Sequence, residues 1–422
     1  MKMNIKNKST QNVNIFFKQL KEYTDFNIFV HTDKSGALQE ALNSDNRLKP
    51  LSKIDGILIA VKSNIPVKTF PFTAGIEEFK DITSNYNDPL IDLIKNNGGI
   101  IIGLTNMDEA AFGGDTSTSF YGTCENPLNI NCSVGGSSGG SAAAISSGLV
   151  NYAIGTDTMG SVRIPASYCG ITSFKPSSTL NNNDYIKKLS NTYDTIGFMG
   201  KKILHINNLI ESINQIDKFK KVDVNFLNNI NCIVPNQIFD SDINNDVLQN
   251  FKSIILKLIK NNINIEYKKL NLWKPNYHRK ALLKIVEYEG SKNLKQLLDN
   301  NKSQISDGLR KNLIFGKNLN DKIIYDIKKN LENLKQNINI SCKTNDLIIM
   351  PTTPQTTFNR MLEIPYNQAN FTSLANIADL PAITIPIYQK ENKKPFSLQI
   401  MSSNKNDHNL LKISSYLEKI LQ

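Results

Sequence analysis

Two short apolar segments separated by one helical segment constrain the fold of this chain most. Residues 56–61 and 99–104 are continuously apolar and bounded by turn residues, which is typical of strands buried on both faces of a sheet. The segment between them, 88–97, has helical spacing. Three of its residues are expected to face the core: Leu90, Leu93 and Ile94. This strand, helix, strand alternation predicts an α/β architecture.

A second feature is a stretch rich in Gly and Ser from Gly135 to Pro165, which contains two separate serine-bearing turns. The first turn spans 135–140 and the second 157–161. Glycines in such turns let the backbone approach a ligand and direct its N–H groups inward. A flexible linker is not favoured, because apolar segments bound the stretch. A phosphate loop is not favoured either, because no Gly-Lys-Ser/Thr follows the glycines.

This stretch resembles the signature of the amidase signature family of serine hydrolases. It departs from the family pattern at Met159, where relatives usually carry Gly or Ala. The segment 58–65 is similar to the family's lysine-bearing strand, with Ser63 in place of the usual Asp. The resemblance is strong over residues 27–200 and moderate over 346–422.

The resemblance implies a role for each site residue. Lys62 would be the base, Ser137 a bridging serine that follows a cis peptide bond, and Ser161 the nucleophile. Four backbone N–H groups would form the oxyanion hole: those of Thr158, Met159, Gly160 and Ser161. Three side chains are expected to support the site: Asp157 and Arg163, as an ion pair that holds the second turn, and Ser138. The candidates for the substrate pocket are Phe112, Gly113, Met159 and Asn370.

A lysine can act as a base only when it is neutral, so its free pKa of about 10.4 must be lowered by burial or by nearby positive charge. Lys62 ends a buried apolar segment, which suits such a shift. The hydroxyl of Ser137 can both donate and accept, so it can relay a proton between Ser161 and Lys62.

The family fold implied here is a large mixed, twisted sheet covered by helices on both faces, with a helical insert. We expect one amidase domain over residues 1–422, with a variable helical insert at 205–345 that shapes the substrate entrance. One helix of the insert has a clear apolar face: Val247, Phe251, Ile254, Ile255 and Leu258.

Composition excludes several classes of function. The net charge is +11, but Lys is spread along the chain and no compact basic run occurs, which argues against direct nucleic-acid binding. The five cysteines do not have the spacing of metal ligands, and no metal or cofactor is expected. These cysteines suggest a reducing compartment, so the expected location is the cytoplasm. The sequence contains no apolar run of about 18 residues, so no membrane span is predicted. The four histidines are scattered along the sequence. A Ser-His-Asp triad is not excluded, because triads are assembled in space, but no feature of the sequence supports one.

Three functions remain open. The leading one is a stand-alone amidase acting on a small-molecule amide. The alternative is the glutaminase (A) subunit of a glutamyl-tRNA(Gln) or aspartyl-tRNA(Asn) amidotransferase, which the segment 106–109 resembles and which would need two partner subunits. Against it, Ala369 occupies the place of that subunit's glutamine-contacting Asp. The third is a pseudoenzyme with a binding role, which the departures at Met159 and Ser63 motivate. A homodimer is compatible with all three.

Within the segment 106–109, the adjacent carboxylates of Asp108 and Glu109 allow two interpretations. They could form an acid–base pair, or they could mark an acidic helix N-terminus, which the helix dipole favours. The second interpretation is the expected one.

Overall fold

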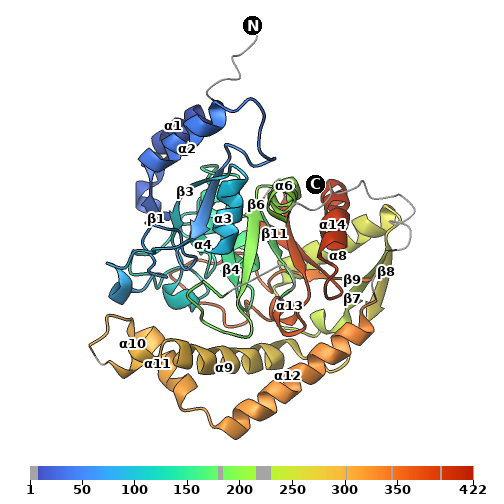
Figure 1. The fold of residues 1–422 in the computed structure, drawn as a ribbon. Helices are drawn as coiled ribbons and strands as arrows, with labels where there is room; N and C mark the ends of the chain where they lie inside the picture. The colour runs from blue at the N-terminus through green and yellow to red at the C-terminus, as the bar shows by residue number, and fades with distance from the viewer. Residues whose placement is uncertain are drawn as a thin grey trace.

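The structure is a computed structural model that describes residues 8–178, 184–214, 230–300, 302–343, 346–389 and 392–421. Eleven strands form one sheet in the order β1-β3-β2-β4-β6-β5-β10-β11-β9-β7-β8 (Figure 1). The strands are β1 (Phe29–Thr32), β2 (Leu58–Lys62), β3 (Ile100–Thr105), β4 (Tyr152–Asp157), β5 (Thr172–Lys175), β6 (Thr195–Gly200), β7 (Asn231–Pro235), β8 (Asn264–Lys268), β9 (Asp346–Pro351), β10 (Ala382–Gln389) and β11 (Asn392–Ser402).

The sheet is mixed. Strand β2 lies parallel to β3 and β4, and β7 lies parallel to β8 and β9. The remaining neighbours, β1 with β3 and the run from β4 through β6, β5, β10 and β11 to β9, are antiparallel. The two continuously apolar segments of the sequence correspond to β2 and β3, which lie side by side and are fully buried. The predicted α/β fold with a large mixed sheet is confirmed.

Helices cover both faces of the sheet, and strand β2 shows why every residue in it is apolar up to its end. Leu58 and Ala60 pack into a core shared with helices α1, α2, α4 and α5. Ile59 and Val61 point the other way, into a core shared with α3 and α6. Alternate residues of a strand face opposite sides, so a strand covered on both sides is apolar throughout.

The helices of the core are α1 (Lys8–Leu20), α2 (Lys34–Asp45), α3 (Pro89–Asn96), α4 (Gly139–Ser146), α5 (Arg163–Tyr168), α6 (Ile203–Asn214), α13 (Ser373–Ile377) and α14 (Asp407–Leu421). Those between β7 and β9 are α8 (Asn245–Lys260), α9 (Pro275–Asn293), α10 (Lys295–Asp299), α11 (Asp307–Lys317) and α12 (Asp321–Ser341). Among the described residues there are also short 3-10 helices: η1 (Lys21–Phe26), η2 (Glu77–Phe79), η3 (Glu109–Ala111) and η5 (Asn236–Ile238).

The segment 205–345 contains more than helices. Its strands β7 and β8 extend the sheet at one end. The apolar face expected from residue 247 to residue 258 is buried in α8. Helices α9 and α12 lie along one side of the core, as the orange part of the ribbon in Figure 1 shows. We name residues 275–341, which hold α9 to α12, the cap.

The helix between β2 and β3 turns a different face to the core than the one expected. Ile94 is buried as predicted, but Leu93 is 42% exposed and Ile91 is buried in its place. Apolar residues at 90, 91, 93 and 94 give two overlapping helical faces, so spacing alone cannot choose between them. The side chain of Asp88 accepts from the N–H of Leu90 and marks the start of the helix, and packing against α6 accompanies the burial of Ile91.

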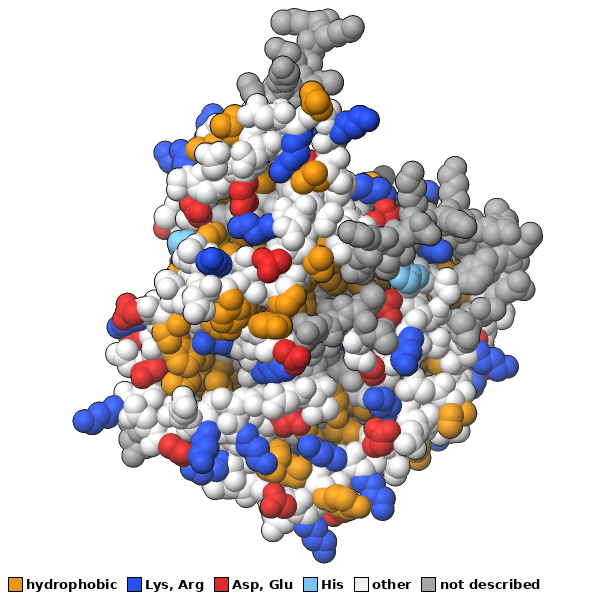
Figure 2. All heavy atoms as spheres, viewed as in Figure 1, with side chains coloured by type: hydrophobic (Ala, Val, Ile, Leu, Met, Phe, Trp, Pro, Cys, Tyr) orange, Lys and Arg blue, Asp and Glu red, His pale blue; other side chains and the backbone are white. Residues whose placement is uncertain are grey.

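Charge is dispersed on the molecular surface. On the face drawn in Figure 2, Lys and Arg side chains are interspersed with Asp and Glu and form no single large patch. None of the described helices is long and apolar enough to cross a bilayer.

The exchange of faces in α3 gives a matched pair of variants. Ile91→Ala should lower the free energy of unfolding by about 2–5 kcal/mol, because it leaves a cavity in the core. Leu93→Ala, two residues away on the same helix, should change it by about 1 kcal/mol or less, because its side chain is largely in water. Urea unfolding followed by circular dichroism measures both, and equal losses would contradict the assignment of the buried face.

Candidate active site

The side chain of Lys62 meets Ser137 at the carboxyl end of β2. Lys62 is the last residue of that strand and continues the face of Leu58 and Ala60, which is the face covered by α4. Its Nζ donates to Ser137 Oγ at 2.8 Å and to Thr156 Oγ1 at 2.8 Å, and its side chain is 0% exposed. Two of the three residues assigned to catalysis from the sequence are therefore in direct contact.

Burial is the main influence on the charge of Lys62. It lowers the pKa of this amine from 10.5 to about 7, against the opposing effect of the carboxylates of Asp108, Asp194 and Asp157. Within the described ranges, none of these carboxylates is within ion-pair distance of the Nζ atom. A large share of the amine is therefore neutral near pH 7, as a base requires.

The turn that carries Ser137 contains the cis peptide bond implied by the resemblance, between Gly136 and Ser137. The N–H of Asp108 donates to the carbonyl of Ser137 at 3.2 Å. The Asp108 carboxylate accepts from the N–H of Thr116 at 3.0 Å and approaches Gly136 so closely that a Cβ there would overlap it. Only glycine fits at position 136.

The turn that carries Ser161 is built around the carboxylate of Asp157. This carboxylate accepts from the N–H of Gly160 at 2.8 Å and from the N–H of Val162 at 3.2 Å. Gly160 has a φ of +129°, and a Cβ there would overlap the hydroxyl of Thr372. Tight packing and unusual backbone geometry together explain the glycine.

Asp157 also forms the ion pair with Arg163 that the sequence predicted. Arg163 Nε and Nη2 donate to its two oxygens at 3.0 and 2.8 Å, and both side chains are 0% exposed. Burial acts to raise the pKa of Asp157, but the charge of Arg163 outweighs it and holds that pKa well below its usual range. The lowered pKa favours the ionised form of Asp157, which the ion pair with Arg163 requires.

Arg163 fastens the turn to distant parts of the chain. Its Nη1 donates to the carbonyl of Thr372 and to Gln399 Oε1, each at 2.7 Å, and its Nη2 donates to Asn376 Oδ1 at 2.6 Å. Asn376 in turn donates to Asp157 Oδ1 at 2.9 Å. Neither Gln399 nor Asn376 was identified from the sequence, because no local pattern links residues more than 200 positions apart.

Ser138 joins the two turns to each other. Its N–H donates to the carbonyl of Ser161 at 3.1 Å, and its hydroxyl donates to the carbonyl of Thr156 at 3.1 Å. Ser161 is 8% exposed, and its own hydroxyl has no hydrogen-bond partner among the described residues. The backbone of Ser161 is thus held beside Ser138, and among the described residues its hydroxyl is not hydrogen-bonded to Ser137.

The four N–H groups expected at the oxyanion hole are not equivalent. The N–H of Gly160 donates to Asp157 Oδ1. The N–H groups of Met159 and Ser161 have no acceptor in the part of the chain that the structure describes. Thr158 is fixed by its side chain, whose hydroxyl donates to Asp194 Oδ1 at 2.6 Å. No motif of the sequence analysis pointed to this contact of Asp194.

The acidic residues Asp108 and Glu109 serve neither as a pair nor as helix caps. Asp108 precedes η3 but its carboxylate binds residues 116–118 instead of the helix. Glu109 accepts from the N–H of Ser306 at 3.0 Å and from its hydroxyl, at the start of α11. The expected acidic helix N-terminus is present, because Asp108 immediately precedes η3 and Glu109 is its first residue, but both carboxylates bind residues outside this helix.

The four candidates for the substrate pocket differ in exposure and in their contacts. Met159 is half-buried, and its carbonyl accepts from the Thr372 hydroxyl at 2.6 Å. Asn370 is 3% exposed and its Oδ1 accepts from Arg279 Nε at 3.1 Å. Phe112 is half-buried, and Gly113 is exposed beside Asp108.

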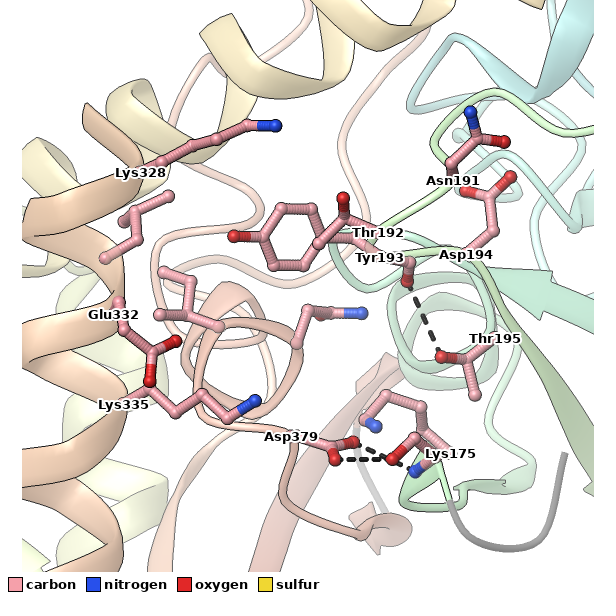
Figure 3. A pocket seen from close by; sticks show the side chains of 14 residues that line it. Lys175, Asn191, Thr192, Tyr193, Asp194, Thr195, Lys328, Glu332, Lys335 and Asp379 are labelled. Carbon is pink, nitrogen blue, oxygen red and sulfur yellow. Dashed lines mark hydrogen bonds between the residues drawn. The ribbon is translucent and has the colours of Figure 1, made fainter. Parts of the chain in front are cut away.

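Two pockets are relevant here, and only one of them is lined by a candidate residue. Asn370 is at the base of one of about 730 Å³, which is also lined by Trp273 and Tyr366. Another, of about 520 Å³, lies between residues 191–195 and helix α12 (Figure 3). The hydroxyl of Ser161 lines neither.

The histidines lie outside the site. In the described part of the chain, none of the four is hydrogen-bonded to Lys62, Ser137 or Ser161: for example, His31 packs on Phe70, and His278 bonds the backbone of its own helix start. Across all the residues that the structure describes, no cluster of His, Cys, Asp or Glu is placed to hold a metal ion.

Comparisons with known proteins match this geometry. The family profile described as Amidase matches residues 11–411. The A subunit of the glutamyl-tRNA(Gln) amidotransferase of Methanosphaera stadtmanae is 30% identical over 447 aligned residues, covering 97% of this chain and 96% of the relative.

Solved structures of other proteins share this fold. One described as the crystal structure of an amidase superposes with a TM-score of 0.90 at 22% identity, covering 98% of this chain and 96% of the other. The A subunit of the glutamyl-tRNA(Gln) amidotransferase of Thermotoga maritima superposes with a TM-score of 0.75 at 26% identity, covering 90% of each chain. The match over 11–411 spans the sheet, both serine turns and Lys62, and the chain therefore belongs to the amidase family of amidase signature enzymes, hydrolases that act on amide C–N bonds.

Proposed function

We propose that this chain is a stand-alone amidase that hydrolyses a small carboxylic amide through an acyl intermediate on Ser161. The observation that carries the proposal is the buried contact of 2.8 Å between Lys62 Nζ and Ser137 Oγ. A buried amine with a pKa of about 7 beside a serine hydroxyl can accept and return a proton near neutral pH.

The proposed reaction proceeds in two steps. Ser161 Oγ attacks the amide carbon, and its proton passes through the Ser137 hydroxyl to Lys62. The oxyanion accepts hydrogen bonds from the backbone at 158–161; because the N–H of Gly160 is directed to Asp157, those of Thr158, Met159 and Ser161 are the donors we assign. The C–N bond then breaks as the leaving nitrogen takes the proton, and water releases the carboxylic acid from Ser161.

A second candidate is the glutaminase (A) subunit of a tRNA-dependent amidotransferase. Its support is that curated relatives bearing this name are 28–30% identical over nearly the whole chain. Against it stands Ala369, whose methyl group cannot accept from a glutamine ammonium as the subunit's Asp would. In that case the chain would work with partner subunits. In either case we place it in the cytoplasm, in keeping with its five free, buried cysteines.

Ammonia release by the purified chain from a panel of amides, glutamine included, separates the two candidates. A stand-alone amidase should release ammonia or amine from at least one simple amide without any partner. Turnover of glutamine alone, and only in the presence of partner subunits, would favour the amidotransferase. If no amide is hydrolysed with or without partner subunits, the result would favour the third function, a pseudoenzyme with a binding role.

Ser161→Ala should abolish amide turnover and leave the fold intact, because the nucleophile is lost and almost no packing changes. Turnover and the far-ultraviolet circular dichroism spectrum of both proteins check this. Comparable turnover by variant and parent would remove Ser161 from the mechanism.

Lys62→Ala and Ser137→Ala should each lower the turnover rate by orders of magnitude, since each interrupts the same proton relay. The double variant should lose far less than the product of the two single effects, because residues that act as a unit are not additive. The measurement is the turnover rate constant of the parent, of each single variant and of the double variant, which together form a double-mutant cycle. Full multiplicativity would mean that the two residues do not share one relay.

The pH profile tests Lys62 as the base. Its folded-state pKa is lowered to about 7, so the amine is neutral above that pH and protonated below it, and kcat/KM should fall as pH drops through about 7. Lys62→Arg keeps the charge and cannot deprotonate in this range, so it should be nearly inactive at every pH. Lys62→Met should be inactive as well, because it lacks a nitrogen lone pair.

The matched controls for this test are the four histidines, each replaced by Gln. The acidic limb should survive each replacement, because none of them contacts the site. Strong activity in Lys62→Arg, or loss of the limb in one histidine variant, would contradict a lysine base.

A further inference from the structure

A chain of hydrogen bonds links the cap to the turn that carries Ser161. It begins at Asp194, which is 6% exposed. One oxygen of this carboxylate accepts from the Thr158 hydroxyl at 2.6 Å, and the other accepts from the N–H groups of Leu189 at 2.7 Å and Ser190 at 3.1 Å. Asp194 thus ties the turn at 157–161 to the loop 189–194.

The other side of this loop is held by Glu289 of α9. This carboxylate, on a residue that is 6% exposed, accepts from the Ser190 hydroxyl at 2.6 Å and from the hydroxyl and N–H of Thr192 at 2.6 and 3.1 Å. Lys328 of α12 lies 3.5 Å from it. The carboxylate of Glu289 therefore connects α9 to α12 through Lys328, and it also binds the loop through Ser190 and Thr192.

Ser190 connects the two carboxylates. Its N–H donates to Asp194 and its hydroxyl donates to Glu289, so the side chain of Thr158 is linked to α9 through Asp194 and Ser190. Figure 3 shows residues 191–195 of this loop on one wall of the pocket, with Lys328 and Lys335 of α12 across from them. The residues of this linkage are buried, and its three hydrogen bonds measure 2.6, 3.1 and 2.6 Å, so α9 and the turn at 157–161 are held to the same loop.

The geometry points to Glu289 and Asp194 as positioning residues for the oxyanion turn, which makes the cap a structural requirement of catalysis and not only a wall of the entrance. This inference rests on the proposed function. Oxyanion donors are effective when they are fixed in advance at the place where charge develops. Thr158 is one of the assigned donors, and its side chain has no other hydrogen bond among the described residues than the one to Asp194.

Asp194 has a second effect, which distinguishes it from Glu289. Its negative charge is one of three, with those of Asp108 and Asp157, that favour the protonated form of Lys62. Removing it should therefore move the acidic limb of kcat/KM to lower pH, while the charges of Asp108 and Asp157 remain. Glu289 is absent from the groups that act on Lys62, so its removal should leave the limb in place.

The test compares Asp194→Asn and Glu289→Gln with the parent. Both should lower kcat by about tenfold or more, with KM changed by no more than about threefold, because donors are misplaced and substrate contacts are kept. The control is Glu332→Gln on α12, an exposed carboxylate facing the same pocket that binds only Gln336 among the described residues. It should match the parent in both constants.

A second readout does not depend on knowing the substrate. A fluorophosphonate reacts with an activated serine: the Ser161 Oγ–P bond forms, the P–F bond breaks, fluoride leaves, and the serine proton passes to the base. Mass spectrometry gives the rate of labelling at Ser161. The rate should fall in Asp194→Asn and Glu289→Gln and stay at the parental value in Glu332→Gln.

Thr158→Val and Thr158→Ser keep the test falsifiable if the carboxylate variants do not fold. The valine variant removes the hydroxyl without changing shape and should lose rate as Asp194→Asn does. The serine variant keeps the hydroxyl and should recover most of that loss.

The outcomes separate this inference from the proposed function. Parental labelling and kcat in both carboxylate variants, or a loss confined to KM, would overturn the inference and leave the amidase assignment standing. A parent that neither labels at Ser161 nor hydrolyses any amide would overturn both.

Discussion

The buried ion pair between Asp157 and Arg163 is the interaction on which the turn that carries Ser161 depends. Both side chains are fully removed from water, and desolvating two charges costs more than their attraction returns unless other hydrogen bonds satisfy them. Here Gly160, Val162, Thr372, Asn376 and Gln399 supply those bonds. The turn that carries Ser161 is therefore tied to the core by this network, and loss of either ion would leave the other buried without its counter-charge.

Much of the fold and of the site was predictable because it is encoded locally. Buried strands covered on both faces are apolar throughout, which identified β2 and β3. The residue that ends β2, Lys62, and the serines of two glycine turns follow from short motifs, and the structure places Lys62 against Ser137. The Asp157–Arg163 pair spans only six positions and was also within reach of the sequence.

What could not be predicted depends on tertiary contacts. The sequence offered two faces for α3, and packing chose Ile91. It gave no sign that β7 and β8 would join the sheet beside β9, or that the N–H of Gly160 would be directed to Asp157. The contact between Asp194 and Thr158 joins residues 36 positions apart without any motif. Each of these is decided by which surfaces meet once the sheet has formed.

The distances in sequence spanned by Arg163 bear on what a partly synthesised chain can hold in place. Arg163 lies 209 positions before Thr372, 213 before Asn376 and 236 before Gln399, the three residues outside its own turn that accept its hydrogen bonds. A nascent chain that ends soon after the second turn therefore contains Lys62, Ser137, Ser161 and the Asp157–Arg163 pair, but it lacks these three acceptors. By the roles proposed above, such a chain carries the nucleophile on a turn that is not yet fastened to the rest of the molecule.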